Sequence, residues 1–378
     1  MDLSLTAEQE QLLGVAKEFA RGQVVPSLRG GVFEVGSPRP FEVWRQMGDL
    51  GWFSLAMPED RGGLASEPMD TAMLLQGLGA GPVPGPVFED IVLLPAVLAA
   101  LGWPVGPDLI DALMAGQLRV AVALPACGRG PGTVMTSTLT SSGGQVTGEV
   151  FPVREVTDAT HLLLLSRRAG AGGEHDLILL PVGADGVSLE PLAGFAPGQG
   201  RLSLDGADTS AATAVITLTQ PDLARLGDAV LASVPALCAF QLGSCESVLE
   251  MSVRYSQQRV QFGRPIGSFQ RVQDHVIDLL NGVDSARWTT YFALSGLRPG
   301  GADRAAIHVA KAATSVAHFC GCDSAHEVHA GIGADVDYGL APHTFVSRCL
   351  YPYLGSPSWH RKRLIHELGL NPRRTEVA

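Results

Sequence analysis

The sequence is short of basic residues and of long apolar runs. Lys and Arg number 27 against 38 Asp and Glu, which gives a formal net charge of -11. Because an acidic chain repels the phosphate backbone, we expect no nucleic-acid partner. The longest apolar run, near Ile91–Leu101, is interrupted by Pro95 and is too short to span a bilayer. No basic targeting segment is visible. These features predict a cytoplasmic protein that does not enter a membrane.

Cysteine is also scarce, and its spacing suggests neither a disulfide framework nor a metal centre. Cys320 and Cys322 are the only close pair, and no second pair accompanies them as in a zinc site. Scattered thiols are typical of a reducing compartment. We therefore expect free thiols and no metal. The six cysteines are Cys127, Cys238, Cys245, Cys320, Cys322 and Cys349.

The distribution of apolar residues predicts three regions in a chain of 378 residues. Helical spacing fills residues 1–117, beginning with a capping-box pattern at Thr6 and Gln9. Residues 118–220 contain short β-branched or leucine runs separated by Gly, Asp, Ser and Thr, which predict a small all-β domain. Long helical patterns return over 221–378. The expected strands are 118–124, 161–165, 177–181, 186–189, 201–204 and 214–218.

The most specific stretch is Tyr255–Gln270, YSQQRVQFGRPIGSFQ, which follows a long helical pattern. Gly263 gives the backbone freedom and Pro265 fixes φ, so the chain has to leave the helix here. We expect Arg259 on the last helical turn, where its planar guanidinium can donate a fork of hydrogen bonds to a phosphate. The plainer alternative makes Arg259 and Arg264 solvated cations at a helix C-terminus.

This stretch resembles the signature of the acyl-CoA dehydrogenase family, in which Arg-x-x-Phe-Gly ends one long helix and Phe-Gln opens the next. The resemblance implies FAD as cofactor, which this turn reaches across a dimer interface in the neighbouring subunit. The matching positions are Arg259, Phe262, Gly263, Pro265, Ile266, Phe269 and Gln270. It also implies an α+β multidomain fold, with an N-terminal helical domain, a middle β-barrel domain and a C-terminal four-helix bundle, over nearly the whole chain.

A second motif, HEVHAGIGADVDYG at His326–Gly339, is similar to the Gln-x-His-Gly-Gly-x-Gly run of the same family. In the family this run binds the FAD pyrophosphate. The positions that match are His329, Gly331 and Gly333. Glu327 replaces the Gln and Ala330 replaces the first Gly; a carboxylate repels pyrophosphate, and a methyl group blocks close backbone approach. We expect an impaired half-site, with a plain turn kept for packing as the alternative.

The segments that contact the flavin ring in the family are altered here. The family's Thr-Glu-Pro strand end corresponds to Ala123, Leu124 and Pro125, followed by Ala126. Its Trp-x-Thr/Ser segment falls near 151–156, which contains no tryptophan. Because a leucine cannot hydrogen-bond the flavin, the contacts that tune the ring are expected to be missing.

The catalytic carboxylate is missing as well. The family's reaction needs a base near the thioester α-carbon, and the two positions that members use for it are occupied by Leu354 and Ser233. Asp228 lies just upstream of Ser233 and is a weak candidate for a relocated base. Glu246 and Glu250 are four residues apart, and with Arg254 four residues further on they predict a solvated helix face. His360 and residues 361–363 predict a solvated basic turn on the final helix. As an alternative, these residues contact a CoA phosphate.

These intact and missing parts together resemble the non-catalytic subunit of an actinobacterial heteromeric acyl-CoA dehydrogenase. The ending LGSPSWHRKRLIHELG is similar to those α2β2 enzymes of steroid side-chain and related acyl-CoA catabolism. The resemblance implies a heterotetramer with a catalytic paralogue and an FAD shared with it. Two alternatives remain: a self-sufficient flavoenzyme with a relocated base, and a non-catalytic scaffold that binds neither FAD nor CoA.

Overall fold

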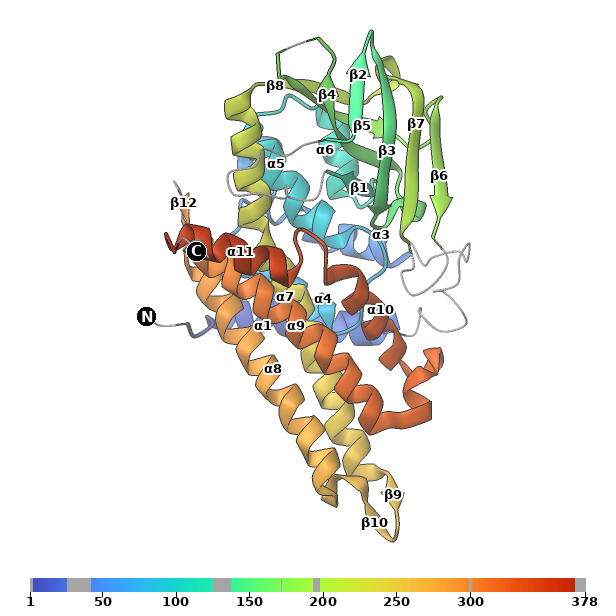
Figure 1. Cartoon of the computed structure of the whole chain (residues 1–378), viewed down its shortest axis with the longest axis vertical. Helices are drawn as coiled ribbons and strands as arrows, with labels where there is room; N and C mark the ends of the chain where they lie inside the picture. Colours follow the sequence, from blue (N-terminus) through green and yellow to red (C-terminus); the bar gives the residue numbers. More distant parts are fainter. Residues whose placement is uncertain are drawn as a thin grey trace, which may run out of the picture.

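The computed structural model describes residues 3–25, 42–124, 137–170, 172–192, 198–298 and 301–370. A β-sheet lies at one end of the molecule, long C-terminal helices extend away from it, and N-terminal helices lie between the two (Figure 1). This arrangement confirms the expected α+β fold, in which one helical part precedes the sheet in the sequence and another follows it.

The N-terminal part is helical, as its apolar spacing predicts. The Thr6 hydroxyl accepts the Gln9 amide N–H, and the Gln9 side chain accepts the Thr6 N–H, so the capping box is confirmed. Its helical segments are α1 (Ala7–Phe19), η1 (Ala20–Val24), α3 (Glu42–Asp49), η2 (Trp52–Ser54), η3 (Glu59–Arg61), α4 (Pro68–Gly79), η4 (Glu89–Leu93), α5 (Leu94–Leu101) and α6 (Pro107–Met114).

The middle part forms one mixed sheet of eight strands, in the order β6-β7-β3-β2-β4-β5-β8 with β1 paired to β4. The sequence did not predict β2 or β3. The strands are β1 (Val120–Ala123), β2 (Leu139–Ser142), β3 (Gln145–Val153), β4 (His161–Arg168), β5 (His175–Pro181), β6 (Val187–Pro191), β7 (Gly200–Asp208) and β8 (Ala214–Leu218), with the short turns η5 (Val156–Asp158) and η6 (Thr209–Ala211).

Strand β4 shows why this sheet packs on both faces. Its side chains alternate between faces, and Leu162–Leu165 are all fully buried. Leu163 and Leu165 join the large core shared with the helices, whereas Leu162 and Leu164 join a second core within the sheet region. The sheet is thereby fixed against the N-terminal helices, and the loops at its end face them.

The C-terminal part is built on long helices with two small β-ribbons. Helix α7 is apolar and long enough to cross a membrane, but 67% of its most apolar window is buried, as in the core helix of a bundle. The elements are α7 (Gln220–Gln258), β9 (Val260–Gln261), β10 (Arg264–Pro265), η7 (Ile266–Ser268), α8 (Gln270–Ser295), β11 (Leu297–Arg298), β12 (Gly301–Ala302), α9 (Arg304–His329), η8 (Ala330–Ala334), η9 (Val336–Tyr338), α10 (Leu340–Leu350) and α11 (Pro357–Glu367).

Helices α4 and α7 approach each other very closely through glycine. A Cβ atom on Gly243 would lie 1.8 Å from the Gln76 carbonyl oxygen, and one on Gly79 would lie 2.1 Å from the Phe240 carbonyl oxygen. Neither distance leaves room for a methyl group. This crossing therefore sets the position of α7, and with it the position of the hairpin that follows α7.

Candidate functional site: the hairpin after α7 and the closed junction of the three parts

The stretch Tyr255–Gln270 ends a helix and forms a short hairpin that projects from the molecule. Helix α7 ends at Gln258, and Arg259 follows it in an extended conformation, with φ -74° and ψ 119°. The expectation that Arg259 lies on the last helical turn was therefore wrong by one residue. Phe262 and Gly263 form the tip with φ of 53° and 77°. Strands β9 and β10 lie at the far end of the long helices from the sheet (Figure 1).

The side chains of this hairpin are turned outward. Phe262 is 92% exposed, and its ring lies 6.1 Å from that of Phe269. The Arg264 guanidinium stacks 4.2 Å from the Phe269 centroid. Arg259 is exposed, and its guanidinium has no hydrogen-bond or ion-pair partner in the part of the chain that the structure describes. Gln270 is exposed at the first turn of α8. The hairpin thus carries a cation, an amide and a phenyl ring that are all exposed on the described part of the chain.

The glycine-rich turn is fastened to the helix that carries this hairpin. His329 is fully buried, and its Nδ1 lies 2.8 Å from the Ala325 carbonyl oxygen. Its ring stacks 4.7 Å from the ring of Tyr255, near the end of α7. Gly331 has open space around it, whereas a Cβ on Gly333 would lie 2.9 Å from His326 Nδ1. The two sequence motifs are therefore joined through His329 and Tyr255, and Gly333 is required by packing.

Ala330 carries backbone strain at the start of this turn, with φ 55° and ψ -139°. This region is essentially restricted to glycine, which is the residue that the family has here. We expect Ala330→Gly to raise the free energy of unfolding by about 1 kcal/mol, since relief of strain exceeds the added chain entropy. Denaturant unfolding measures the change. Ala334→Gly is the control, because Ala334 has no positive φ; equal destabilisation by both variants would contradict this interpretation.

The two positions expected for a catalytic carboxylate lie in apolar surroundings. Leu354 packs against the buried cluster that contains Val234, the neighbour of Ser233 on α7. Ser233 is buried, and its hydroxyl donates to the Ala229 carbonyl oxygen at 2.8 Å. Asp228 is 66% exposed and forms an ion pair of 2.5 Å with Arg304. The two positions share one region, and neither of their side chains can accept a proton there.

The backbone around Leu354 is held by two buried basic side chains. Lys311 Nζ donates to the Leu350 carbonyl oxygen at 3.0 Å. His360 is fully buried, its Nε2 lies 3.1 Å from the Leu354 carbonyl oxygen and its Nδ1 lies 2.8 Å from His308 Nδ1. Burial lowers the pKa of His360 to about 3. The expectation that His360 belongs to a solvated basic turn is therefore wrong: this histidine is neutral and structural.

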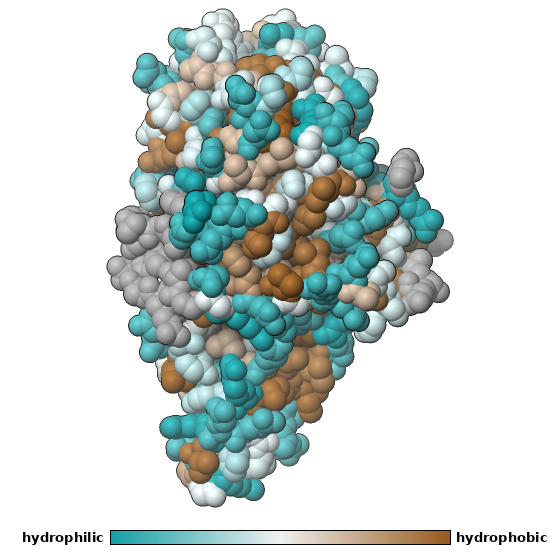
Figure 2. Space-filling model, turned by 180° about the vertical axis from the view of Figure 1, so that it is seen from behind, coloured by the Kyte–Doolittle hydropathy of each residue, from teal (hydrophilic) through white to brown (hydrophobic). Residues whose placement is uncertain are grey.

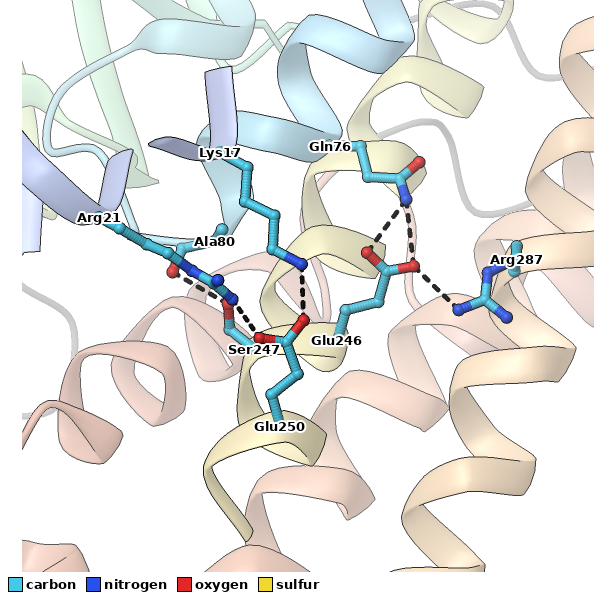
Figure 3. A network of polar contacts seen from close by, with 8 residues as sticks. All are labelled: Lys17, Arg21, Gln76, Ala80, Glu246, Ser247, Glu250 and Arg287. Atoms are coloured by element: carbon cyan, nitrogen blue, oxygen red, sulfur yellow. Dashed lines mark hydrogen bonds and ion pairs between the residues drawn. The ribbon is translucent and has the colours of Figure 1, made fainter. Parts of the chain in front are cut away.

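The acids on α7 are engaged with other elements. Figure 3 shows that the Glu246 and Glu250 carboxylates reach different partners on different helices. The contacts join Glu246 to Gln76 and Arg287, and Glu250 to Lys17 and Arg21. Glu246 is only 17% exposed, so the prediction of a solvated face is corrected for this residue. Both carboxylates fix α7 against its neighbours.

The segment 151–156, where the family contacts the flavin ring, ends in a buried charged cluster. Arg154 Nη2 lies 2.5 Å and Nε 3.0 Å from the two Glu89 carboxylate oxygens. Arg154 Nη1 donates to Glu155 at 3.1 Å, and the other Glu155 oxygen accepts the Gly85 N–H at 3.2 Å. The Arg154 guanidinium also lies 5.3 Å from the Tyr353 ring centroid. This cluster could not be predicted from the sequence, because Glu89 lies 65 positions before Arg154 in the chain.

The single Arg154 guanidinium pairs with two carboxylates of this chain, those of Glu89 and Glu155. Burial acts to lower the pKa of Arg154, but Glu89 and Glu155 hold it above its ordinary value. Burial and the Glu89 carboxylate raise the pKa of Tyr353 well above its ordinary value. Leu124 packs against the same large core, and Pro125 and Ala126 lie outside the described residues. At this place the Glu89, Arg154 and Glu155 side chains are therefore paired with one another, whereas the hairpin carries an exposed guanidinium.

Comparisons with known proteins agree with this fold over nearly the whole chain. The model described as "Acyl-CoA dehydrogenase, N-terminal domain" matches residues 6–98, and "Acyl-CoA dehydrogenase, C-terminal domain" matches residues 233–368. The acyl-CoA dehydrogenase FadE27 of Mycobacterium tuberculosis is 28% identical, over 98% of this chain and 100% of its own length.

Two solved structures show a sequence identity to this chain that is close to that of FadE27. A chain in the ChsE4-ChsE5 complex from Mycobacterium tuberculosis is 26% identical with a TM-score of 0.81, covering 98% of this chain and 100% of that one. A chain in the structure of a Tcur3481-Tcur3483 steroid ACAD variant is 26% identical with a TM-score of 0.79, covering 96% and 98%. Together with the two domain models, these likenesses show that the chain belongs to the acyl-CoA dehydrogenase family.

Proposed function

We propose that this chain is the non-catalytic subunit of a heteromeric FAD-dependent acyl-CoA dehydrogenase. The proposal rests on one observation: the hairpin with Arg259 is complete and projects outward, whereas Leu354 and Ser233 occupy the positions of the base. A catalytic paralogue binds most of the FAD and supplies the carboxylate. This chain completes the cofactor site from outside.

The hairpin residues have separate tasks in this arrangement. Arg259 donates its guanidinium fork to the FAD pyrophosphate, because its geometry matches phosphate oxygens. Gln270 offers an amide to the same cofactor, and Phe262 and Phe269 give an apolar surface beside it. Ile266 is half-buried and supports the turn from within. Gly331 and Gly333 form a second, weaker contact, because Glu327 is exposed next to the turn and repels phosphate.

The chemistry of the assembly follows from the division of residues. Desaturation removes an α-proton from the acyl-CoA, which needs a positioned base, and FAD, when bound, would supply the acceptor for the β-hydride. The buried Glu89, Asp90 and Glu155 carboxylates of this chain are each engaged by other groups, so the proton goes to a carboxylate of the paralogue. The role of this chain is to bind and orient the cofactor.

The surface of α8 supports an assembly of unlike chains. Ile277, Leu280, Trp288 and Phe292 are large apolar residues that are more than 40% exposed. Their spacing places all four on one face of the helix. The space-filling view in Figure 2 shows apolar areas among polar ones on the helical half of the molecule. Contiguous exposed apolar surface marks interaction sites.

The similar structures point to the same kind of assembly and substrate. The ChsE4-ChsE5 and Tcur3481-Tcur3483 structures each involve two named proteins, and the second is of a steroid ACAD. We therefore propose a cytoplasmic heterotetramer made of two copies of each chain, acting on the CoA thioester of a steroid side chain or a related acyl group.

Co-expression with a paralogue that retains the family's carboxylate tests this assignment. The expected product is a mixed complex that contains one flavin for each pair of unlike chains, measured by native mass and by absorbance after denaturation. A homomeric assembly with one flavin in every chain would contradict the proposal and favour a self-sufficient flavoenzyme. A stable mixed complex without flavin would favour the scaffold.

A further inference from the structure

All three parts of the chain meet at the Arg154 side chain. Glu89 comes from η4 in the N-terminal helices, Glu155 follows β3 of the sheet, and Tyr353 follows α10 in the C-terminal helices. Glu89 is 1% exposed and the Arg154 side chain 10% exposed, so solvent screens these contacts little. One guanidinium thus contacts all three parts of the chain.

We propose that Arg154 is a positioning residue: an internal cation that holds this three-part junction closed in the absence of any ligand. The Glu89–Arg154–Glu155 cluster lies at segment 151–156, where the family resemblance implies a flavin contact. The proposal rests on the proposed function, which leaves this chain without a flavin or acyl-CoA of its own.

The geometry suits a permanent closure. The fork of Arg154 binds Glu89 in a bidentate manner, which is the strongest arrangement of this pair. Glu155 also contacts the N-terminal part, because its carboxylate accepts the Gly85 N–H. A second link lies next to it, where the buried Asp90 carboxylate accepts the Val120 N–H of β1 at 3.1 Å. Phe88 packs edge-on to Tyr353 at 6.4 Å and seals the cluster on its apolar side.

The test uses the free chain and three variants. Arg154→Met leaves the Glu89 and Glu155 carboxylates buried and uncompensated, so we expect the thermal midpoint to fall by about 5 °C. Glu89→Met should cause a smaller fall, because Arg154 still pairs with Glu155. The triple variant Glu89→Met/Arg154→Met/Glu155→Gln should recover at least half of the loss, because no charge of the cluster then remains buried. Arg201→Met is the control, since Arg201 pairs with Glu149 at the exposed surface of the same sheet.

Hydrogen–deuterium exchange shows whether the junction itself opens. Peptides containing Gly85 and Tyr353 should exchange faster in Arg154→Met but not in Arg201→Met, and added FAD and acyl-CoA should not change their exchange in the parent chain. The inference is overturned if the losses in the triple variant are additive, if exchange is unchanged in Arg154→Met, or if FAD protects these peptides. A failure of the proposed function is seen separately, in the flavin content of the mixed complex.

Discussion

We expect Arg259→Ala to empty the mixed complex of flavin and to leave its assembly intact. The guanidinium is exposed at the projecting hairpin and is unpaired among the described residues, so its removal breaks no contact among them. Under the proposed function, it removes two charge-assisted hydrogen bonds to the pyrophosphate, about 3 kcal/mol, which weakens flavin binding by roughly 100-fold. The ratio of flavin to protein absorbance after gel filtration measures this loss.

Arg264→Ala is the matched control on the same hairpin. Its guanidinium stacks on the Phe269 ring of the same chain. The control carries the same change of charge, so it should retain most of the flavin. Equal loss in both variants would show that net positive charge, and not the fork of Arg259, attracts the cofactor. Full flavin retention in Arg259→Ala would contradict the proposed function.

Gly243→Ala is expected to lower the stability of the chain strongly. The added methyl group would lie 1.8 Å from the Gln76 carbonyl oxygen, so α4 and α7 have to separate. Overpacking a rigid contact costs about 3 kcal/mol, and here the obstacle is backbone that cannot rotate away. The midpoint of denaturant unfolding should fall accordingly. Because α7 carries the hairpin, flavin in the mixed complex should decrease as well.

Gly227→Ala gives the opposite expectation on the same helix. A Cβ on Gly227 would meet no atom within 4 Å. Alanine is a better helix former than glycine by about 1 kcal/mol, so this variant should be slightly more stable than the parent. If the two variants shift unfolding by the same amount in the same direction, the close crossing at Gly243 does not control the position of α7.

Features encoded by neighbouring residues could be predicted from the sequence. The capping box at Thr6 and the end of α7 near Arg259 depend on local spacing and on residues with restricted φ. Strand β3 was not predicted, although it is one of the two longest strands. Gly148 and Pro152 interrupt its pattern, and its mostly exposed side chains lack the apolar run used to recognise the other strands.

Contacts between distant parts of the chain could not be predicted in the same way. The four-residue spacing of Glu246 and Glu250 indicates a shared helix face, but it does not show that α1, α4 and α8 cover that face. Likewise, Glu89 and Arg154 are separated by 65 positions, and no local pattern relates them. The burial of His360 could not be predicted either, because it depends on the contact between α9 and α11.

The flavin content of this chain expressed alone tests the central claim most directly. The chain is purified without any paralogue, mixed with excess FAD and passed through gel filtration, and its visible spectrum is recorded before and after addition of acyl-CoA thioesters. We predict a colourless protein that retains no flavin and oxidises no thioester. A yellow protein with one flavin per chain, bleached by an acyl-CoA, would contradict the account.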